Sequence, residues 1–351
     1  MFFKSKKVIG LDIGTSSIKM AELNVSGSSV ELVSFVFSQT PPQSVSGGEL
    51  LDTAALSTVI EGMASELKSK SKLVAMSMWG TSVIVKKITI PKMEKKVLKD
   101  QIKFEAEQYL PFDLNNIRLV YQILKNSDSP DTMDVILVAA QNELVNQYTR
   151  LVSSAGLTCS ILDVSGFALA NLFELNYGKS SNEVIALFNF GASTTNLSIV
   201  HSGEVIFARD IPVGGQTYTN EIHKSMGITI QEAEALKMSA SKRGEVPDEV
   251  HSIINATNDL VTEEIKSSLD FFIASNNGTK ISKCFYTGGS AATNGLISNI
   301  SKNAGLSLDP INPFKKIKIN TSKFSSDYIE KISPFSAIVL GLALRKVGDH
   351  D

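Results

Sequence analysis

Residues 8–23 read VIGLDIGTSSIKMAEL. Two apolar runs rich in β-branched residues, 8–13 and 18–23, flank a short corner of glycine and hydroxyl residues at 14–17. Apolar runs on either side of a tight turn of small residues predict two strands joined by that turn. We therefore expect a β-hairpin with its corner at Gly14.

A second hairpin of the same kind is expected half a chain later, where residues 185–200 read IALFNFGASTTNLSIV. A shift of 177 positions, from 12 to 189, superimposes the two stretches. This shift aligns Asp12 with Asn189, Gly14 with Gly191, Ser16 with Ser193, and Ser17 with Thr194. The repetition predicts an internally duplicated α/β protein with two lobes.

The composition is that of a folded globular protein. The chain has 351 residues, of which 43% are hydrophobic and 20% charged, and this excludes a disordered or fibrous chain and allows about two domains. The net charge of −2 gives no overall field that would favour nucleic acid.

Cys159 and Cys284 form no disulfide framework or metal motif, so we expect both to be buried. We expect no targeting signal and no membrane span, and hence a protein of a reducing compartment.

The residues around the hairpins predict two further regions. A strand at 30–37 and a helix at 50–67 continue the first lobe. A block of different texture follows, with strands at 73–78, 82–90, 117–124 and 133–140, a charged helix from residue 94 that ends before Pro111, and a helix at 142–153. We interpret this block as a small α+β module inserted in the first lobe. After the second hairpin we expect helices at 231–241, 250–273, 293–304 and 334–345, and a strand at 283–287.

The hairpin corners have the composition of an anion-binding turn. Without a Cβ, Gly14 allows backbone N–H groups to point toward a phosphate, and neighbouring hydroxyls add donors. Lys19 would offer a cation to the β- and γ-phosphates, and Asp12 would hold water on a bound Mg²⁺. An ordinary turn is the alternative for one corner alone, because Asp and Gly are common in turns. Two such corners facing each other across a cleft would clamp a triphosphate.

Five segments resemble the actin, Hsp70 and sugar-kinase superfamily. The two hairpins are similar to its two phosphate loops, and residues 286–291 to its adenosine loop. Residues 161–170 and 334–343 are similar to its two connecting helices, where Ala337 and Gly341 would allow a close crossing. The resemblance implies that the nucleotide is bound by Asp12, Gly14, Thr15, Ser16, Ser17, Lys19, Asn189, Gly191, Ala192, Ser193, Thr194, Thr195, Glu263, Lys266, Gly288, Gly289 and Ser290. For Glu263 and Lys266, solvated surface charges are the alternative.

The inserted module resembles more specifically the PilM family of actin-like proteins of type IV pilus assembly, through residues 88–93 and 104–112. The cell-division protein FtsA is a more distant relative. The resemblance implies ATP or ADP with Mg²⁺ between the lobes. It also implies a cytoplasmic protein at the inner membrane that binds the N-terminal peptide of the membrane protein PilN, with pilus motor or platform proteins and self-association as further contacts.

The same resemblance implies an actin-like, ribonuclease H-like fold with four subdomains. We expect subdomain 1A at 1–75 and 156–183, the inserted subdomain 1C at 76–155, subdomain 2A at 184–218 and 284–332, subdomain 2B at 219–283, and a C-terminal helix packing on 1A at 333–351. As lining of the peptide groove we expect apolar residues of the module, namely Ile88, Phe104, Leu110 and Phe112. The lysines between Lys86 and Lys103 alternate with acidic residues, so we interpret them as a solvated face; anionic lipid or an acidic partner is the alternative.

One position departs from the superfamily pattern. Asn189 stands where the superfamily usually has Asp, and an amide can bond a metal-bound water but brings no negative charge. Asp163, which we place in the first connecting helix, is the candidate catalytic carboxylate, with a helix cap as the alternative. We expect nucleotide binding with little or no turnover. A sugar-kinase-like phosphotransferase and an FtsA-like polymerising ATPase are the alternative functions.

Overall fold

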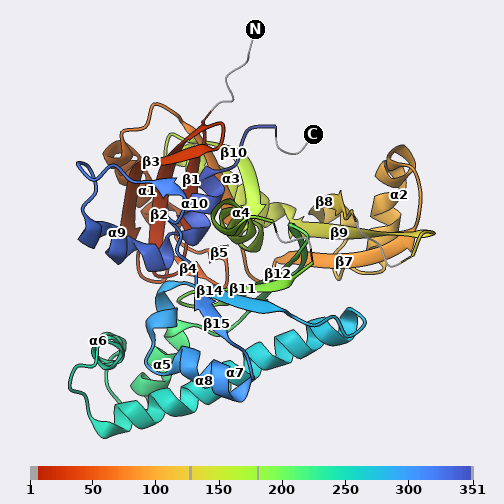
Figure 1. Cartoon of the computed structure of the whole chain (residues 1–351). Coiled ribbons are helices and arrows are strands. Elements are labelled where there is room, and N and C mark those ends of the chain that lie inside the picture. Colours follow the sequence, from red (N-terminus) through yellow and green to blue (C-terminus); the bar gives the residue numbers. More distant parts are fainter. Residues whose placement is uncertain (1–6, 126–128, 180–181, 349–351) are drawn as a thin grey trace.

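The computed structural model describes residues 7–125, 129–179 and 182–348. Two lobes and a projecting module make up the molecule (Figure 1). The first lobe contains a six-stranded sheet in the order β10-β6-β1-β2-β3-β16. Its strands are β1 (Ile9–Ile13), β2 (Ser17–Ser26), β3 (Ser29–Gln39), β6 (Leu73–Met78), β10 (Thr158–Val164) and β16 (Ile317–Lys318). A small hairpin, β4 (Val45–Ser46) and β5 (Glu49–Leu50), precedes α1 (Thr53–Leu67).

The second lobe repeats this topology with a five-stranded sheet in the order β13-β12-β11-β14-β15. Its strands are β11 (Val184–Phe190), β12 (Thr195–His201), β13 (Glu204–Ile211), β14 (Lys283–Thr287) and β15 (Leu308–Pro310). In both lobes an antiparallel meander (β1-β2-β3 or β11-β12-β13) is extended by a strand parallel to its first member, β6 or β14. The predicted duplication is therefore confirmed by the sheet topology.

The two hairpins also match in register. Asp12 lies opposite Lys19 in the first hairpin, and Asn189 lies opposite Asn196 in the second, at the same shift of 177 positions. Each corner is closed by one backbone bond: the Gly14 N–H donates to the Ser17 carbonyl at 3.1 Å, and the Gly191 N–H donates to the Thr194 carbonyl at 2.9 Å. The expected corners are thus present at equivalent places.

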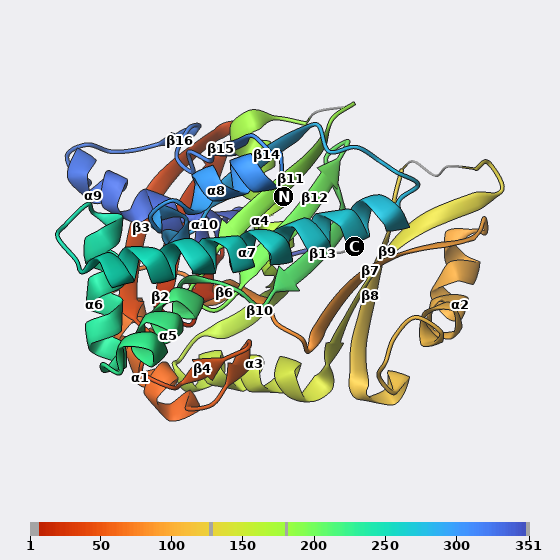
Figure 2. The ribbon, with the colours of Figure 1, turned by 90° about the horizontal axis from the view of Figure 1, so that it is seen from below.

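Helices cover both sheets. On one face of the first sheet lie α1 and α3 (Asn142–Ser154), and on the other face lie α4 (Ser165–Tyr177) and α10 (Ala337–Ala343). Four helices share the core of the second lobe with its sheet, as the view from below in Figure 2 shows. They are α5 (Gly215–Met226), α6 (Ile230–Ser241), α7 (Asp248–Ser275) and α8 (Leu296–Asn303). Helix α9 (Ser326–Ile332) returns to the core of the first lobe and joins α10 through a short 3₁₀ turn (Ser333–Phe335).

Helices α4 and α10 cross closely, as the small residues predicted. A Cβ placed on Gly341 would overlap the Ala168 carbonyl, so only glycine allows α10 to approach α4 at this point. The helix expected over 161–170 is partly wrong. Residues 158–164 form strand β10, which pairs with β6, and α4 begins only at Ser165. Pairing with a strand distant in sequence outweighs the local helical pattern here.

The inserted module is an antiparallel sheet, β7-β9-β8, covered by α2. Its elements are β7 (Val83–Pro91), α2 (Lys95–Glu107), a 3₁₀ turn (Leu114–Asn116), β8 (Ile117–Ile123) and β9 (Thr132–Gln141). Leu98, Ile102 and Ala106 are the buried face of α2. Helix α3, which the expected subdomain boundary at 155 includes in the module, packs on α1 in the core of the first lobe.

Candidate functional site

The two hairpin corners touch each other. The Thr15 Oγ1 and Ser193 Oγ atoms lie 2.7 Å apart, and either hydroxyl can be the donor. The N-terminus of α5 packs on the second corner, because the N–H groups of Gly215 and Gln216 donate to the carbonyls of Gly191 and Ala192 at 3.0 and 2.7 Å. The expectation that the corners approach one another is confirmed.

Inside the first hairpin, Asp12 and Lys19 form a buried ion pair. The distance from Lys19 Nζ to Asp12 Oδ2 is 3.0 Å, and the side chains are 9% and 11% exposed. A Cβ on Gly14 would lie only 3.3 Å from Lys19 Nζ, so the ammonium group is held directly under the corner. A cation and a carboxylate are therefore both present where the sequence predicted contacts to phosphate and to Mg²⁺.

In the second hairpin, a chain of hydrogen bonds takes the place of this ion pair and runs through two amide side chains to a carboxylate. Asn189 Nδ2 donates to Asn196 Oδ1 at 2.8 Å, and Asn196 Nδ2 donates to Asp210 Oδ1 at 2.6 Å. The second oxygen of Asp210 accepts the Gly80 N–H of the first lobe at 2.6 Å. Burial raises the pKa of Asp210, and the hydrogen bonds that it accepts from Gly80 and Asn196 act in the opposite direction. Sequence reasoning missed Asn196 and Asp210.

Thr195 and the turn at Gly288 frame the second corner. The Thr195 side chain is fully buried and donates to the Val213 carbonyl, so of the predicted hydroxyls this one points into the lobe. Gly288 has a φ of +104°, and a Cβ there would overlap the Phe190 backbone. The Ser290 hydroxyl lies where a Cβ on Gly215 would be, which brings the predicted adenosine turn against the start of α5. Glycine is required at position 288, where backbone blocks a Cβ, whereas a side chain at position 215 would displace the Ser290 hydroxyl.

The predicted pair Glu263 and Lys266 is not brought to this place. Both residues are exposed on α7, and no hydrogen bond or ion pair found for the described residues connects them to the corners or to Gly288. A pair with the same spacing, Glu234 and Lys237 on α6, lies there instead. Lys237 is buried and donates to Glu234 Oε2 at 2.6 Å and to the Gly215 carbonyl at 3.1 Å. Its charge is thus held beside the turn that carries Ser290.

Asp163 lies at the end of β10 and not on a helix. Its carboxylate forms an ion pair with Arg345, with 3.4 Å between Oδ2 and Nε, and its other oxygen accepts the Val164 N–H at 2.8 Å. The side chain is 5% exposed. The alternative role as a side-chain cap of α4 is not seen, since no side chain caps that helix.

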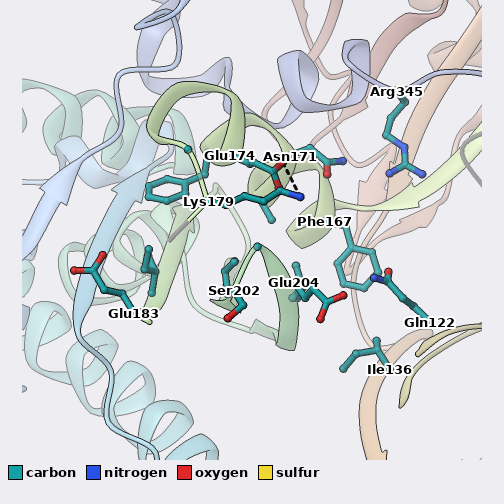
Figure 3. Close-up of a pocket in the computed structure, with 17 residues that line it drawn as sticks. Gln122, Ile136, Phe167, Asn171, Glu174, Lys179, Glu183, Ser202, Glu204 and Arg345 are labelled. Carbon is teal, nitrogen blue, oxygen red and sulfur yellow. Dashed lines mark ion pairs between the residues drawn. The ribbon is translucent and has the colours of Figure 1, made fainter. Parts of the chain in front are cut away.

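A cavity of about 170 Å³ lies where the first lobe, the second lobe and the module meet (Figure 3). Helix α4 contributes Phe167 and Asn171 to its wall, and the hairpin before β13 contributes Ser202 and Glu204. The module contributes Gln122 and Ile136, and Arg345 closes one side. The cavity therefore combines an apolar surface with charged groups and is shared by three parts of the molecule.

The four residues expected to line a peptide groove have different environments. Ile88 and Leu110 are buried in the core of the module, and Phe112 packs against that core. Only Phe104 is strongly exposed, with 75% of its surface accessible on α2. Ile88 and Leu110 therefore contribute to stability and cannot contact a partner in this conformation.

The duplicated lobes, the touching corners and the crossing of α4 and α10 define an actin-like protein of the ATPase fold class. Within this class, a family model described as type IV pilus assembly protein PilM matches residues 10–347, and the chain belongs to that family. No helix in the described part of the chain combines the length and the apolar composition that crossing a bilayer requires.

Solved structures agree with this assignment. A structure titled "PilM-PilN type IV pilus biogenesis complex" is 26% identical, with a TM-score of 0.87 over 97% of this chain and 99% of that chain. The ethanolamine utilization protein EutJ from Carboxydothermus hydrogenoformans is 15% identical (TM-score 0.58, 97% and 90% covered). MreB5 of Spiroplasma citri bound to ADP is 14% identical (TM-score 0.50, 96% and 94% covered). The last two show similarity of fold.

Proposed function

We propose that this chain is an adenine-nucleotide-binding scaffold of type IV pilus assembly that binds the cytoplasmic tail of a PilN protein. The observation that carries the nucleotide proposal is the contact between Thr15 and Ser193, because it brings two equivalent glycine corners to one point. A relative of the same fold, MreB5 of Spiroplasma citri, is solved with ADP. A relative of the same family is solved in a complex with PilN.

The residues around the corners suit a nucleotide. The Thr15 and Ser193 hydroxyls and the corner N–H groups can donate to phosphate oxygens, and Lys19 adds a positive charge beneath Gly14. On the adenosine side, Glu234 can accept from ribose hydroxyls while Lys237 fixes its position. Gly288 gives the flat backbone surface that a base needs for close approach.

The residues also suit Mg²⁺, but weakly. Magnesium prefers oxygen ligands and keeps several waters. The Asp12 carboxylate and the oxygen of the Asn189 side-chain amide are oxygen groups of this kind. Asp12 is already neutralised by Lys19, and Asn189 contributes no charge. Because a metal ion and an attacking water both need negative charge for their positioning, we propose binding with slow or no hydrolysis. Asp163 is held by Arg345, which leaves its carboxylate committed to an ion pair.

For the partner's tail we propose the cavity between α4 and the module. Phe167 and Ile136 offer an apolar surface for one side chain of an extended peptide, and Gln122 and Arg345 offer polar contacts to its backbone. Binding there would hold the module against the first lobe. The tail would then keep this chain at the cytoplasmic face of the inner membrane through its partner.

Calorimetric titration of ATP into the full chain, with and without Mg²⁺, tests the nucleotide proposal. We expect binding by the unaltered chain, loss of binding in Lys19→Ala, and a stronger dependence on Mg²⁺ in Asn189→Asp. Unchanged affinity in Lys19→Ala would remove this residue from the site, and no binding to the unaltered chain would refute the proposal.

Fluorescence anisotropy with the labelled N-terminal peptide of the PilN from the same pilus system tests the partner proposal. Phe167→Ala should weaken binding roughly tenfold or more, as expected for loss of an apolar anchor. Phe104→Ala on the exposed face of α2 is the matched control, and it should leave the affinity unchanged. The opposite pattern would move the peptide site from the cavity to α2.

A further inference from the structure

A larger cavity, of about 670 Å³, lies on another side of the module, and neither the nucleotide proposal nor the tail proposal uses it. Its walls are strand β7 of the module, strand β13 of the second lobe and the C-terminal end of α7. Figure 2 shows these three elements converging. We call this cavity the β7–β13 groove.

Both strands of the groove are sheet edges. Among the described residues, β7 pairs only with β9 and β13 pairs only with β12. The two edges lie side by side without belonging to one sheet. A sheet edge carries backbone N–H and C=O groups that have no strand partner, and an extended chain can pair with them.

The two edges run antiparallel to each other, and one hydrogen bond at each end of the groove joins β13 to the module or to the segment just before it. At one end, the Gly80 N–H, just before β7, donates to Asp210 near the end of β13. At the other end, the Lys125 N–H donates at 3.0 Å to Glu204, the first residue of β13. The first bond ties β13 to the start of β7, the second ties it to the segment that follows β8, and the groove lies between them.

The lining shows that the groove follows the two edges and also extends over part of the module sheet, where it reaches Asp134 of the central strand β9. In a strand, successive side chains point to opposite faces, so a pocket over one face is lined by alternate residues. Here consecutive residues line the groove, namely 84–87 of β7 and 206–209 of β13. The backbone of each edge therefore borders the groove directly.

The groove is lined by charges of both signs and by aromatic rings. Its two carboxylates already have partners, since Asp134 is paired with Lys87 and Glu204 accepts the Lys125 N–H. Phe271 at the end of α7 is 56% exposed, and Arg209 lies over its ring at 5.7 Å. Lys86 lies over the ring of Tyr109 at 5.2 Å. Neither cation has a carboxylate partner among the described residues, whereas Lys87 is paired with Asp134 at 2.8 Å. Lys86 and Arg209 are thus available to carboxylates of a bound molecule.

We propose that the β7–β13 groove binds an extended segment of a partner protein that carries acidic and apolar side chains in alternation. The segment pairs through its backbone with the free edge of β7. Its acidic side chains contact Lys86 and Arg209, and its apolar side chains cover Phe271. Lysines on an edge strand discourage indiscriminate strand pairing. An acidic segment turns the same lysines into specific contacts.

A defined probe tests this proposal. The probe is a fluorescein-labelled octapeptide of alternating leucine and glutamate with blocked ends, and its binding to the full chain is measured by fluorescence anisotropy. Two companion peptides replace every glutamate with lysine, or carry N-methyl groups on alternate backbone amides. The double variant Lys86→Gln, Arg209→Gln removes the two cations, and Lys99→Gln on exposed α2 is the matched control.

We expect the acidic probe to bind, and the double variant to weaken this binding at least about tenfold, while Lys99→Gln does not. The lysine and N-methyl peptides should both bind more weakly, because one lacks the charges and the other lacks the backbone donors. No binding of the acidic probe at millimolar concentration, or equal binding of the N-methyl peptide, would overturn the proposal. A dimer in sedimentation that the double variant dissociates would assign the groove to a second copy instead, and would also overturn it.

Discussion

The hydroxyl oxygens of Thr15 and Ser193 lie 2.7 Å apart, although 178 positions separate the two residues in the chain. Each residue belongs to the corner of a hairpin, and the two hairpins occupy equivalent places in the two lobes. A hydroxyl has one proton to donate. In the contact between the corners one hydroxyl donates and the other accepts, so the accepting hydroxyl keeps its own proton for a phosphate oxygen.

Thr15→Val tests whether the corner hydroxyls contribute to binding. Valine keeps the shape of threonine and removes the donor, so we expect ATP to bind roughly tenfold more weakly, as for loss of a hydrogen bond to a charged group. Calorimetry measures the affinity. Thr58→Val on α1, where the hydroxyl only bonds the Ala54 carbonyl of its own helix, is the control and should bind ATP normally. Equal affinities in both variants would place the phosphates away from Thr15.

The ion pair between Asp12 and Lys19 predicts a stability effect that does not depend on nucleotide. Lys19→Met leaves Asp12 buried without its partner, and removal of one member of a buried pair costs about 3–5 kcal/mol of unfolding free energy. The double variant Asp12→Asn, Lys19→Met has no uncompensated charge and should recover most of this loss. Urea denaturation of the nucleotide-free chain measures both. A double variant as unstable as Lys19→Met would mean that packing of the lysine, and not charge, is what matters.

Much of this site could be predicted because its signals are local. A hairpin corner depends on about ten consecutive residues, and the repeat at 177 positions made the second corner as clear as the first. The start of α4 could not be predicted in this way, because residues 161–164 become strand only through pairing with β6, far away in the sequence. Ile88 and Leu110 were expected in a groove because an apolar residue reads alike in a core and on a binding surface.

The side of the site where we predicted adenosine was ambiguous for a related reason. Glu and Lys three residues apart occur on α6 and on α7, and the spacing alone places each pair on one helix face. Only the packing of α6 beside Gly215 distinguishes them. Asp210 gave no signal, since one acidic residue in a strand is common, and its role depends on Gly80 of the other lobe.

Asp210 predicts a specific dependence of stability on pH. Burial raises its pKa above the ordinary value of 3.8, so the folded chain holds this proton more tightly than the unfolded chain. The contribution of Asp210 to stability is therefore full below about pH 4 and decreases as the pH rises through the folded pKa. In Asp210→Asn this decrease is absent, because an amide has no proton to titrate in this range. The amides of Asn189 and Asn196 can reverse and still bond the new side chain.

Melting temperatures of both proteins at pH 4, 5, 6 and 7 measure this effect. The difference between Asp210→Asn and the unaltered chain should shift in favour of the variant as the pH rises. Glu221→Gln, at a partly exposed acid on α5 that is paired with Lys224, controls for the loss of a negative charge and should show no such trend. A constant difference at all four pH values would show that the carboxyl group of Asp210 has an ordinary pKa in the folded chain.

The two Glu and Lys pairs allow a direct test of where adenosine binds. Glu234→Gln keeps the size of the side chain but weakens its acceptor for ribose hydroxyls, so ATP should bind roughly tenfold more weakly. Inorganic tripolyphosphate, which has no ribose, should bind this variant and the unaltered chain equally. The same comparison with Glu263→Gln should show no change for either ligand, because Glu263 is exposed on α7.

A melting temperature taken without ligand separates a folding defect from a binding defect, which is needed since Glu234 also holds Lys237. If Glu263→Gln loses ATP and Glu234→Gln does not, the adenosine lies over α7, and the turn at Gly288 has no part in holding it.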